Sequence, residues 1–369
     1  MERLILHDYH QALGARFTIV NQCETVDDYG DYLGEHAALS QAAAVFDLSF
    51  RSRLCFTGAD RVRYLHGQVT NDVKQLKPGQ GCYAALVTAK GRMQSDLNIY
   101  CLADELLLDF EPGFSRNVAE RLNKYIVADD VQIVDVAAPY GLLSVQGPRS
   151  ADAVKQLGVF GKVPSNPFEF VAQADPTLGE IYLANQPRVG GEGFDLFVPV
   201  SALGAVADKL TAATKAVGGR PGGWRALETA RIEAGIPRFG MDMDETNLPM
   251  ECPIQDRAVS YTKGCYIGQE VLNRVHTMGH VNRHLRGLEL ADNLKQLPQR
   301  GDKLIHGGKE VGFITSTVRS PKWNKNLALG YVRRGIDSLG AEVVLRSAAG
   351  ESTARVSPLP FHFTPGAHT

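Results

Sequence analysis

Two acidic residues occupy glycine-rich turns in which a carboxylate could contact a ligand. Asp96 follows a predicted hairpin turn at residues 89–92, and Glu192 lies between Gly191 and Gly193 in a second turn. A carboxylate beside glycines can accept two hydrogen bonds from a planar ligand that carries an amino group next to a ring N–H. Taken singly, either acid is better explained as a solvated turn residue. If the two hairpins face each other, both carboxylates can point into one central cleft.

Cys265 lies in the segment that is richest in residues capable of chemistry, Lys263-Gly264-Cys265-Tyr266-Ile267-Gly268-Gln269-Glu270. This segment precedes a predicted helix at residues 271–276. Its glycines permit a tight turn that exposes the residues between them. A thiol next to Lys263 and near a helix N-terminus is favoured in its thiolate form. The spacing alone fits a buried structural cysteine equally well. No histidine lies within a few residues upstream to act as a base, which argues against a cysteine hydrolase.

Three histidines, His276, His280 and His284, recur at a spacing of four residues. On one continuous helix they would share a face and could bind zinc. Gly279 and the strand-like run at residues 281–285 predict instead that the helix ends first, so we expect polar residues around a domain boundary and no metal site. The signatures H-E-x-x-H, G-x-S-x-G and G-x-x-x-x-G-K-[ST] are absent, which argues against metal hydrolysis, serine esterase and P-loop chemistry.

The elements that would position these residues form a unit that occurs twice. The first copy contains a helix after Asp60, which we expect Asp60 to cap, strands at 82–87, 97–101 and 106–110, a helix near 113–125 and a strand at 131–136. The second copy begins at Gly147 with a helix, followed by strands at 180–183 and 193–198 and a helix at 201–217. This order predicts two α+β modules with antiparallel sheets, each covered by helices on one face.

The remainder of the chain predicts one more helix and a separate β domain. The helix covers residues 223–234 and ends at Gly235-Ile236-Pro237. Residues 240–262 are polar and irregular, as is typical of a functional loop. After Gly279, short strand-like runs predict a small barrel, with strands at 284–290, 303–306, 310–317, 327–332, 342–346 and 352–356.

Length and composition limit the class of protein. A chain of 369 residues with 44% hydrophobic and 22% charged residues predicts two or three globular domains. A net charge of −2 argues against a nucleic-acid partner, which would require clustered Lys and Arg. No apolar run approaches the roughly 20 residues of a membrane span, and the first eight residues do not resemble a secretory signal. Six scattered cysteines without a C-x-x-C pair indicate reduced thiols, so we expect a cytoplasmic protein with no membrane partner.

The 263–270 segment resembles the signature of YgfZ-type folate-binding proteins, which assist maturation of iron–sulfur enzymes. Around it, nearly the whole chain resembles the glycine-cleavage T-protein (aminomethyltransferase) family. The matching stretches are Glu35-His36, Phe46-Asp47-Leu48-Ser49, residues 56–60, 67–72 and 188–196, and Arg225-Ala226-Leu227-Glu228-Thr229-Ala230-Arg231-Ile232-Glu233-Ala234-Gly235.

The resemblance implies three domains around a central channel that holds tetrahydrofolate. By position, Glu192 matches the family's pterin-binding glutamate, and Asp96 matches an aspartate near the nitrogens that carry the one-carbon unit. Arg225 matches a folate-contacting arginine, with Arg231 as a second. The implied domains are a folate-binding α+β module at 1–45 and 137–240, a second α+β module at 46–136 and 241–279, and a C-terminal β-barrel at 280–369.

Two departures from the T-protein lead to competing hypotheses. The turn R-T-G-Y-T-G-E-D-G is shortened here to residues 188–193, and Phe50 replaces a usual histidine. Cys265 is absent from the typical T-protein. The leading hypothesis is therefore a tetrahydrofolate-binding protein that supports iron–sulfur cluster assembly or repair. In it, Cys265 is a reactive thiol that meets an iron–sulfur client protein, a cluster or an oxidised intermediate. The alternative is a tetrahydrofolate-dependent aminomethyl- or methyltransferase that acts on a small substrate with the help of Asp96. A folate-binding module without catalysis is a third possibility.

Overall fold

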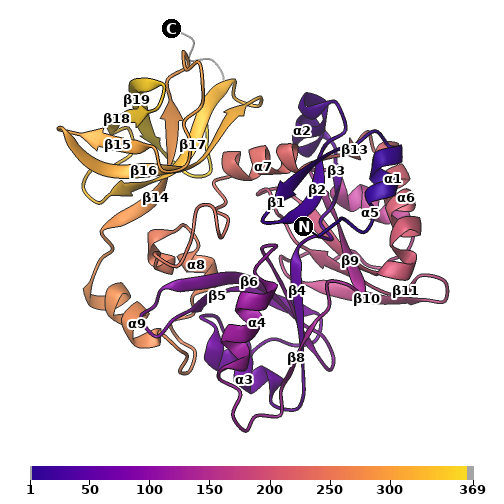
Figure 1. Cartoon of the computed structure of the whole chain (residues 1–369). Coiled ribbons are helices and arrows are strands. Elements are labelled where there is room, and N and C mark those ends of the chain that lie inside the picture. Colours follow the sequence, from indigo (N-terminus) through magenta and orange to yellow (C-terminus); the bar gives the residue numbers. More distant parts are fainter. Residues whose placement is uncertain (1, 364–369) are drawn as a thin grey trace.

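The computed structural model describes residues 2–363 and is built from two large sheets, a short hairpin and a closed barrel (Figure 1). The five-stranded sheet has the order β5-β6-β7-β4-β8, with β4 (Ser52–Thr57), β5 (Gln80–Val87), β6 (Met93–Cys101), β7 (Leu106–Phe110) and β8 (Gln132–Asp135). The six-stranded sheet has the order β10-β11-β12-β9-β3-β13, with β3 (Ala44–Asp47), β9 (Tyr140–Gln146), β10 (Phe170–Asp175), β11 (Gly179–Asn185), β12 (Gly193–Pro199) and β13 (Arg220–Pro221). Only β13 pairs in parallel within these two sheets.

Alternation along the strands gives each sheet two different faces. On β6, Leu97 and Ile99 join the core beneath α3 (Arg61–Gln68) and α4 (Ser115–Asn123), whereas Tyr100 points the other way. On β12, Leu196 joins the core beneath α5 (Ser150–Leu157) and α6 (Val200–Ala216), whereas Phe197 points away from those helices.

The helix-free faces of the two sheets meet, because Phe197 contacts Tyr100 with ring centroids 5.6 Å apart. The two modules therefore pack face to face with their helices outside. This confirms the predicted α+β architecture of paired antiparallel-sheet modules.

Helix α7 (Trp224–Glu233) packs against α2 (Tyr32–Gln41) and connects these sheets to the barrel. Its apolar stripe of Ala226, Leu227 and Ala230 joins the core between the sheets. The helix is followed by Gly235, whose φ of 68° lies in the left-handed region that favours glycine. Both the extent of this helix and its end were predicted correctly.

The closed barrel has the order β14-β17-β16-β15-β18-β19, as predicted from the short C-terminal strands. Its strands are β14 (Arg283–Leu290), β15 (Lys303–His306), β16 (Lys309–Ser320), β17 (Lys325–Arg333), β18 (Glu342–Ser347) and β19 (Gly350–Ser357). Polar contacts fasten it to α7, where Arg231 donates to the Ser316 hydroxyl at 2.8 Å and Ser320 donates to Glu233.

The remaining elements are α1 (His7–Ala12), β1 (Arg16–Val20), β2 (Cys23–Asp28), the 3-10 turn η1 (Pro249–Glu251), α8 (Gln255–Ala258) and α9 (Gln269–Met278). No helix within residues 2–363 combines the length and apolar character needed to cross a membrane.

One predicted cap is wrong. Asp60 does precede α3, but its carboxylate makes no capping bond to that helix. Its Oδ2 accepts a hydrogen bond from the backbone N–H of Asp130 at 3.0 Å, and its Oδ1 accepts from Arg63 at 3.2 Å. The Asp60 carboxylate therefore binds the loop before β8 and does not cap α3. The three domain ranges remain a prediction. Strand β3 extends to Asp47 and so crosses the predicted boundary between residues 45 and 46.

Candidate functional site

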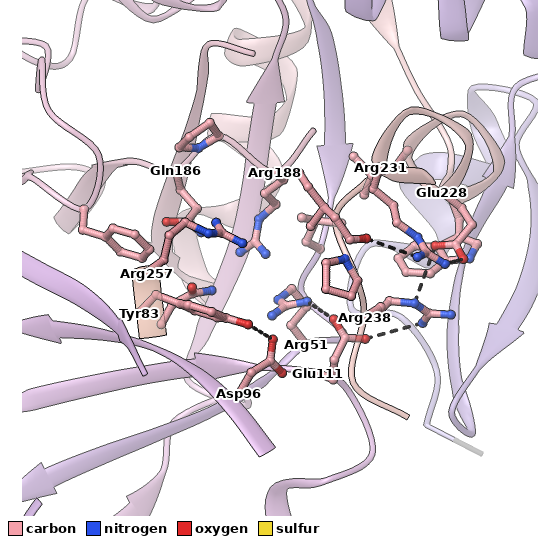
Figure 2. A pocket seen from close by; sticks show the side chains of 18 residues that line it. Arg51, Tyr83, Asp96, Glu111, Gln186, Arg188, Glu228, Arg231, Arg238 and Arg257 are labelled. Atoms are coloured by element: carbon pink, nitrogen blue, oxygen red, sulfur yellow. Dashed lines mark hydrogen bonds and ion pairs between the residues drawn. The ribbon is translucent and has the colours of Figure 1, made fainter. Parts of the chain in front are cut away.

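A cavity of about 120 Å³ lies between the two sheets and α7 (Figure 2). Its walls come from the five-stranded sheet, the loop between β11 and β12, α7 with the loop that follows it, and α8. The lining residues include five arginines and three acids, namely Arg51, Arg188, Arg231, Arg238, Arg257, Asp96, Glu111 and Glu228. This excess of cations favours an anionic or partly anionic ligand.

Asp96 lines the cavity from β6, as predicted. The Tyr83 hydroxyl donates a hydrogen bond to its Oδ2 at 2.8 Å, while its buried Oδ1 has no hydrogen-bond partner within residues 2–363. Burial raises the pKa of Asp96 to about 6, and the negative charge of Glu111 acts in the same direction. A carboxyl with a pKa near neutrality and one free oxygen is suited to general acid–base catalysis.

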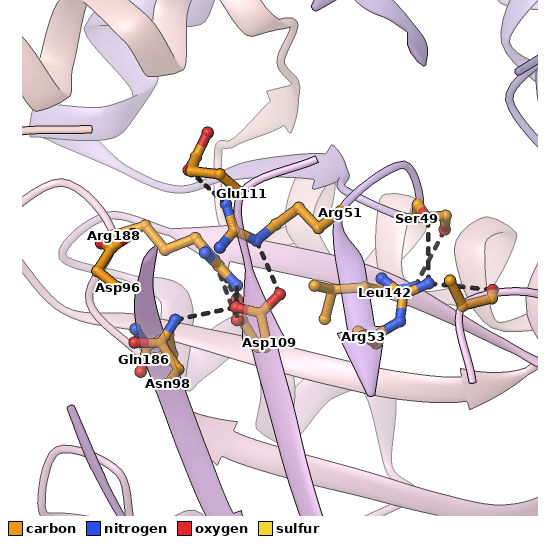
Figure 3. A network of polar contacts seen from close by, with 12 residues as sticks. Ser49, Arg51, Arg53, Asp96, Asn98, Asp109, Glu111, Leu142, Gln186 and Arg188 are labelled. Atoms are coloured by element: carbon orange, nitrogen blue, oxygen red, sulfur yellow. Dashed lines mark hydrogen bonds and ion pairs between the residues drawn. The ribbon is translucent and has the colours of Figure 1, made fainter. Parts of the chain in front are cut away.

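A buried network of ion pairs continues from the cavity lining, to which Arg51 and Arg188 belong (Figure 3). Arg51 donates to Asp109 at 2.8 Å and to Glu111 at 2.9 Å, and Arg188 bridges Asp109, at 3.0 Å, and Asp195. Burial alone would raise the pKa of Asp109, but the charges of Arg51 and Arg188 outweigh it and hold that pKa well below its usual range. These charges are fixed before any ligand arrives, so the site is electrostatically preorganised.

A second set of ion pairs forms the opposite wall. Arg231, on α7, is buried and pairs with Asp242 and Glu228. Arg238 lies between Glu111, at 3.4 Å, and Glu228, at 3.5 Å. The predicted ligand-binding Arg231 therefore lines the cavity, but its charge is already shared between two carboxylates.

Flat aromatic surfaces complete the cavity. Phe168, in the loop before β10, and Trp224, at the start of α7, both line it. Phe168 has a φ of 63°, a left-handed conformation that is rare for a bulky residue and is retained where surrounding structure enforces it. Trp224 stacks beneath Arg238, 4.8 Å from the guanidinium to the ring centroid. These rings suit a planar heterocycle.

Comparisons with known proteins identify the family. Residues 6–263 match the GCVT N-terminal domain, and residues 283–362 match the glycine cleavage T-protein C-terminal barrel domain. The chain belongs to the glycine cleavage T-protein family. This confirms the family resemblance, while membership of the YgfZ-type subfamily stays a prediction.

Curated relatives named aminomethyltransferase match along most of their length. The protein from Halalkalibacterium halodurans is 30% identical and is covered over 89% of both chains. The protein from Geobacillus kaustophilus is 26% identical over 98% of this chain and 99% of its own. The crystal structure of the glycine cleavage system aminomethyltransferase T from Bartonella henselae superposes with a TM-score of 0.88 over 98% of both chains, at 23% identity, which shows a shared fold.

Two residues predicted to bind the ligand lie outside the cavity of this T-protein family member. Glu192 is exposed and is absent from the cavity lining. It lies in the bend directly before β12 (Gly193–Pro199) and is not part of that strand. Arg225 is also exposed, stacks over Tyr32 at 4.1 Å and lines a neighbouring cavity that shares Trp224 with the first.

Cys265 is exposed on the loop before α9 and does not line the cavity with Asp96. Lys263, its expected activating partner, is buried and donates instead to the carbonyls of His66, Val69 and Asn71 at 2.5, 2.7 and 2.9 Å. The ammonium therefore stabilises the C-terminal end of α3. His66 was not singled out from the sequence, although it lies close to the residue that precedes Cys265: its Nε2 would be 3.6 Å from a Cβ placed on Gly264.

The three histidines do not form one site. Helix α9 ends at Met278, before His280 and His284, as the predicted helix stop requires. His276 stacks on Tyr261 with ring centroids 3.8 Å apart, and His284 contacts Asp337 at 2.7 Å. Within residues 2–363 no three His, Cys, Asp or Glu side chains are grouped as a metal site.

Most of the cavity lining was not identified from the sequence. Arg51, Tyr83 and Arg257 come from separate segments that only the fold brings together. One signal was present: Asp109 interrupts the apolar run of β7, Leu106–Phe110, and a charged residue inside a buried strand requires a buried partner.

Proposed function

We propose that this protein is a tetrahydrofolate-dependent one-carbon transferase, an aminomethyl- or methyltransferase that acts on a small substrate. The observation that carries the proposal is Asp96, a carboxyl with a pKa of about 6 and one free oxygen at the wall of an arginine-rich cavity. The aminomethyltransferase names of the full-length relatives support the same reaction class.

The cavity residues fit a reduced pterin. Its flat bicycle requires apolar surfaces, which Phe168 and Trp224 provide, and Asp96 would lie beside the nitrogens that carry the one-carbon unit. When bound, tetrahydrofolate would supply a nitrogen that carries the one-carbon unit. Arg225 and Glu192 would contact its outer part only if that part extends beyond the cavity, and we retain both contacts as proposals.

The chain's own groups account for proton movement and orientation. Near neutral pH, Asp96 exchanges its proton readily, so it can accept a proton from the atom that gains the one-carbon unit or return one to the atom that loses it. The Tyr83 hydroxyl holds Oδ2, which leaves Oδ1 for the reacting atom. Burial and the negative charge of Glu111 raise the pKa of Asp96, and the positive charge of Arg51, which pairs with Glu111, partly offsets them.

Folate binding and transfer are tested separately. Calorimetric titration should show saturable binding of tetrahydrofolate to the wild type, and an absence of binding would refute the proposal. Transfer is followed by NMR with ¹³C-labelled 5-methyl- and 5,10-methylenetetrahydrofolate and a panel of small amines and thiols. Asp96→Asn should reduce transfer by roughly 10²–10⁴-fold, the range for loss of a general acid–base group. The exposed Asp104→Asn on the β6–β7 turn is the matched control and should transfer at the wild-type rate.

A second function, support of iron–sulfur cluster assembly or repair, is favoured by Cys265. Its thiol is exposed, lies outside the cavity and belongs to the 263–270 segment. Such a thiol could meet iron–sulfur client proteins while folate stays bound elsewhere. A deletion strain should then lose iron–sulfur enzyme activity, and Cys265→Ser should fail to restore it, whereas Cys82→Ser should restore it. Full complementation by Cys265→Ser would remove the thiol from this function.

A further inference from the structure

A separate cavity, of about 280 Å³, lies between β4 and β7 of one sheet and β9, β11 and β12 of the other. It shares no lining residue with the arginine-rich cavity, and we call it the Tyr182 cavity. Tyr100 contacts both cavities, since its hydroxyl donates to Gln186 of the first and its ring packs edge-on against Phe197 of the second. A cavity of this size accepts a small molecule.

Three aromatic rings form one wall of the Tyr182 cavity. Tyr182 on β11 is paired with Phe197 on β12, so both side chains lie on the helix-free face of the six-stranded sheet. Tyr140, at the start of β9, adds a third ring, whose centroid is 6.2 Å from that of Tyr182. Both tyrosines are half-buried, so a ligand can reach their rings from solvent. The negative faces of such rings attract organic cations.

Two carboxylates at the same cavity have no basic partner. The exposed Glu180 accepts a hydrogen bond from the Tyr182 hydroxyl at 2.7 Å, and the half-buried Glu105 accepts from the Cys55 thiol at 2.9 Å. In the described part of the chain, neither carboxylate lies within 4.0 Å of a Lys, Arg or His nitrogen. Burial raises the pKa of Tyr140 and Tyr182, and the negative charges of Glu180 and Glu105 raise it further. Both acids therefore lie close enough to the rings to act on the same ligand.

Arg53 also lines the Tyr182 cavity, but its charge does not neutralise these acids. The residue is fully buried, and its Nη2 donates to the carbonyls of Ser49, Ala137 and Tyr140 at 3.0, 3.2 and 2.8 Å. Its Nε and Nη1 are closed off from solvent. The surface that the cavity presents to a ligand is therefore aromatic and acidic.

We propose that the Tyr182 cavity binds a small quaternary ammonium ion, such as choline. The methyl groups of the ion pack against the three rings, and its charge lies near Glu105 and Glu180. A quaternary ammonium has no N–H group to satisfy, so rings and carboxylates are sufficient to bind it. Within residues 2–363 these acids belong to no group of three metal-ligating side chains, which favours an organic cation over a metal ion. The inference does not depend on the proposed transferase function.

The test is calorimetric titration of the full-length protein with choline and with 3,3-dimethylbutan-1-ol, which has the same shape and no charge. Wild type should bind choline at least about tenfold more tightly than the alcohol, because rings and carboxylates act on the charge. Tyr182→Leu should abolish that ratio, whereas Tyr182→Phe keeps the ring and should retain most of it. Glu105→Gln should lower the ratio by about threefold, as expected for a partly exposed ion pair. The exposed Glu120→Gln on α4 is the matched control and should keep the full ratio.

A competition experiment distinguishes the two cavities. Saturating tetrahydrofolate should change the affinity for choline by less than about twofold, because the cavities share no lining residue. Displacement of choline by tetrahydrofolate would place it in the arginine-rich cavity and overturn the proposal. Equal binding of choline and the alcohol, or no saturable binding of choline, also overturns it.

The variants give the remaining outcomes. An undiminished ratio in Tyr182→Leu, or a loss as complete in Tyr182→Phe as in Tyr182→Leu, would show that the ring is not the basis of binding and would overturn the proposal. Urea unfolding checks that each variant is folded, and if Tyr182→Leu is not, Glu105→Gln and the competition still decide. None of these results alters the expected effect of Asp96→Asn, so the proposed function is judged separately.

Discussion

The raised pKa of Asp96 predicts a specific dependence of protein stability on pH. The folded protein holds this carboxyl with a pKa of about 6, against an ordinary value of 3.8. Between those pH values the folded state keeps a proton that the unfolded state has lost, so the contribution of Asp96 to stability decreases as pH rises from about 4 to 6 and is constant above. A shift of about 2 units corresponds to about 3 kcal/mol.

Asp96→Asn removes this titration while it keeps the shape of the side chain. The variant should therefore gain about 3 kcal/mol relative to wild type between pH 4 and pH 7, even though it loses activity. Urea unfolding of both proteins at pH 4, 5, 6, 7 and 8 measures the difference, in which the other titrating groups largely cancel. Tyr83→Phe should have the opposite effect. It removes a hydrogen bond that lowers the Asp96 pKa, so the stability of this variant should decrease more than that of wild type as pH rises.

A constant difference between wild type and Asp96→Asn across this pH range would refute the reasoning. In that case the carboxyl would titrate at an ordinary pKa, and its role as a general acid–base group near neutrality would lose its physical basis. The pH–rate profile supplies an independent check, since transfer should report an essential group that titrates near pH 6.

Two further predictions concern the charges around the site. Arg188→Met should destabilise the fold by about 3–5 kcal/mol in urea unfolding, because Asp195 and Asp109 would lose a buried counter-charge; a cost below about 1 kcal/mol would contradict the network's structural role. Lys263→Met should cost about 1–3 kcal/mol, because the carbonyls at the end of α3 lose their donor. Its alkylation rate at Cys265 should match that of wild type, and a much slower rate would show that Lys263 activates the thiol after all.

The fold was largely predictable because its elements are local and strongly patterned. The barrel strands and α7 follow from periodicity and turn residues within short windows, such as Gly235 after α7. Asp96 was identified from its position after a hairpin turn together with the resemblance to the T-protein family, since the turn alone favours a solvated residue. Both cases need only contacts between residues close in sequence.

The rest of the site depends on contacts that no local pattern contains. Arg257 meets Tyr83 only because α8 packs against β5, and the Tyr100–Gln186 bond exists only because the two sheets face each other. Lys263 also makes contacts that no local pattern contains. From the sequence we expected its charge to act on the nearby Cys265 thiol. Three carbonyls nearly 200 residues away in the chain, between His66 and Asn71, accept its hydrogen bonds instead.

Glu192 receives opposite predictions from the sequence and from its place in the fold. The sequence predicts that Glu192→Gln weakens tetrahydrofolate binding by roughly 1.5–3 kcal/mol. If the folate lies wholly inside the cavity, the exposed position of Glu192 directly before β12 predicts instead a change below about 0.5 kcal/mol. Calorimetric titration of wild type and Glu192→Gln with tetrahydrofolate measures the difference, and a loss of about 1.5 kcal/mol or more would show that the turn closes over the ligand.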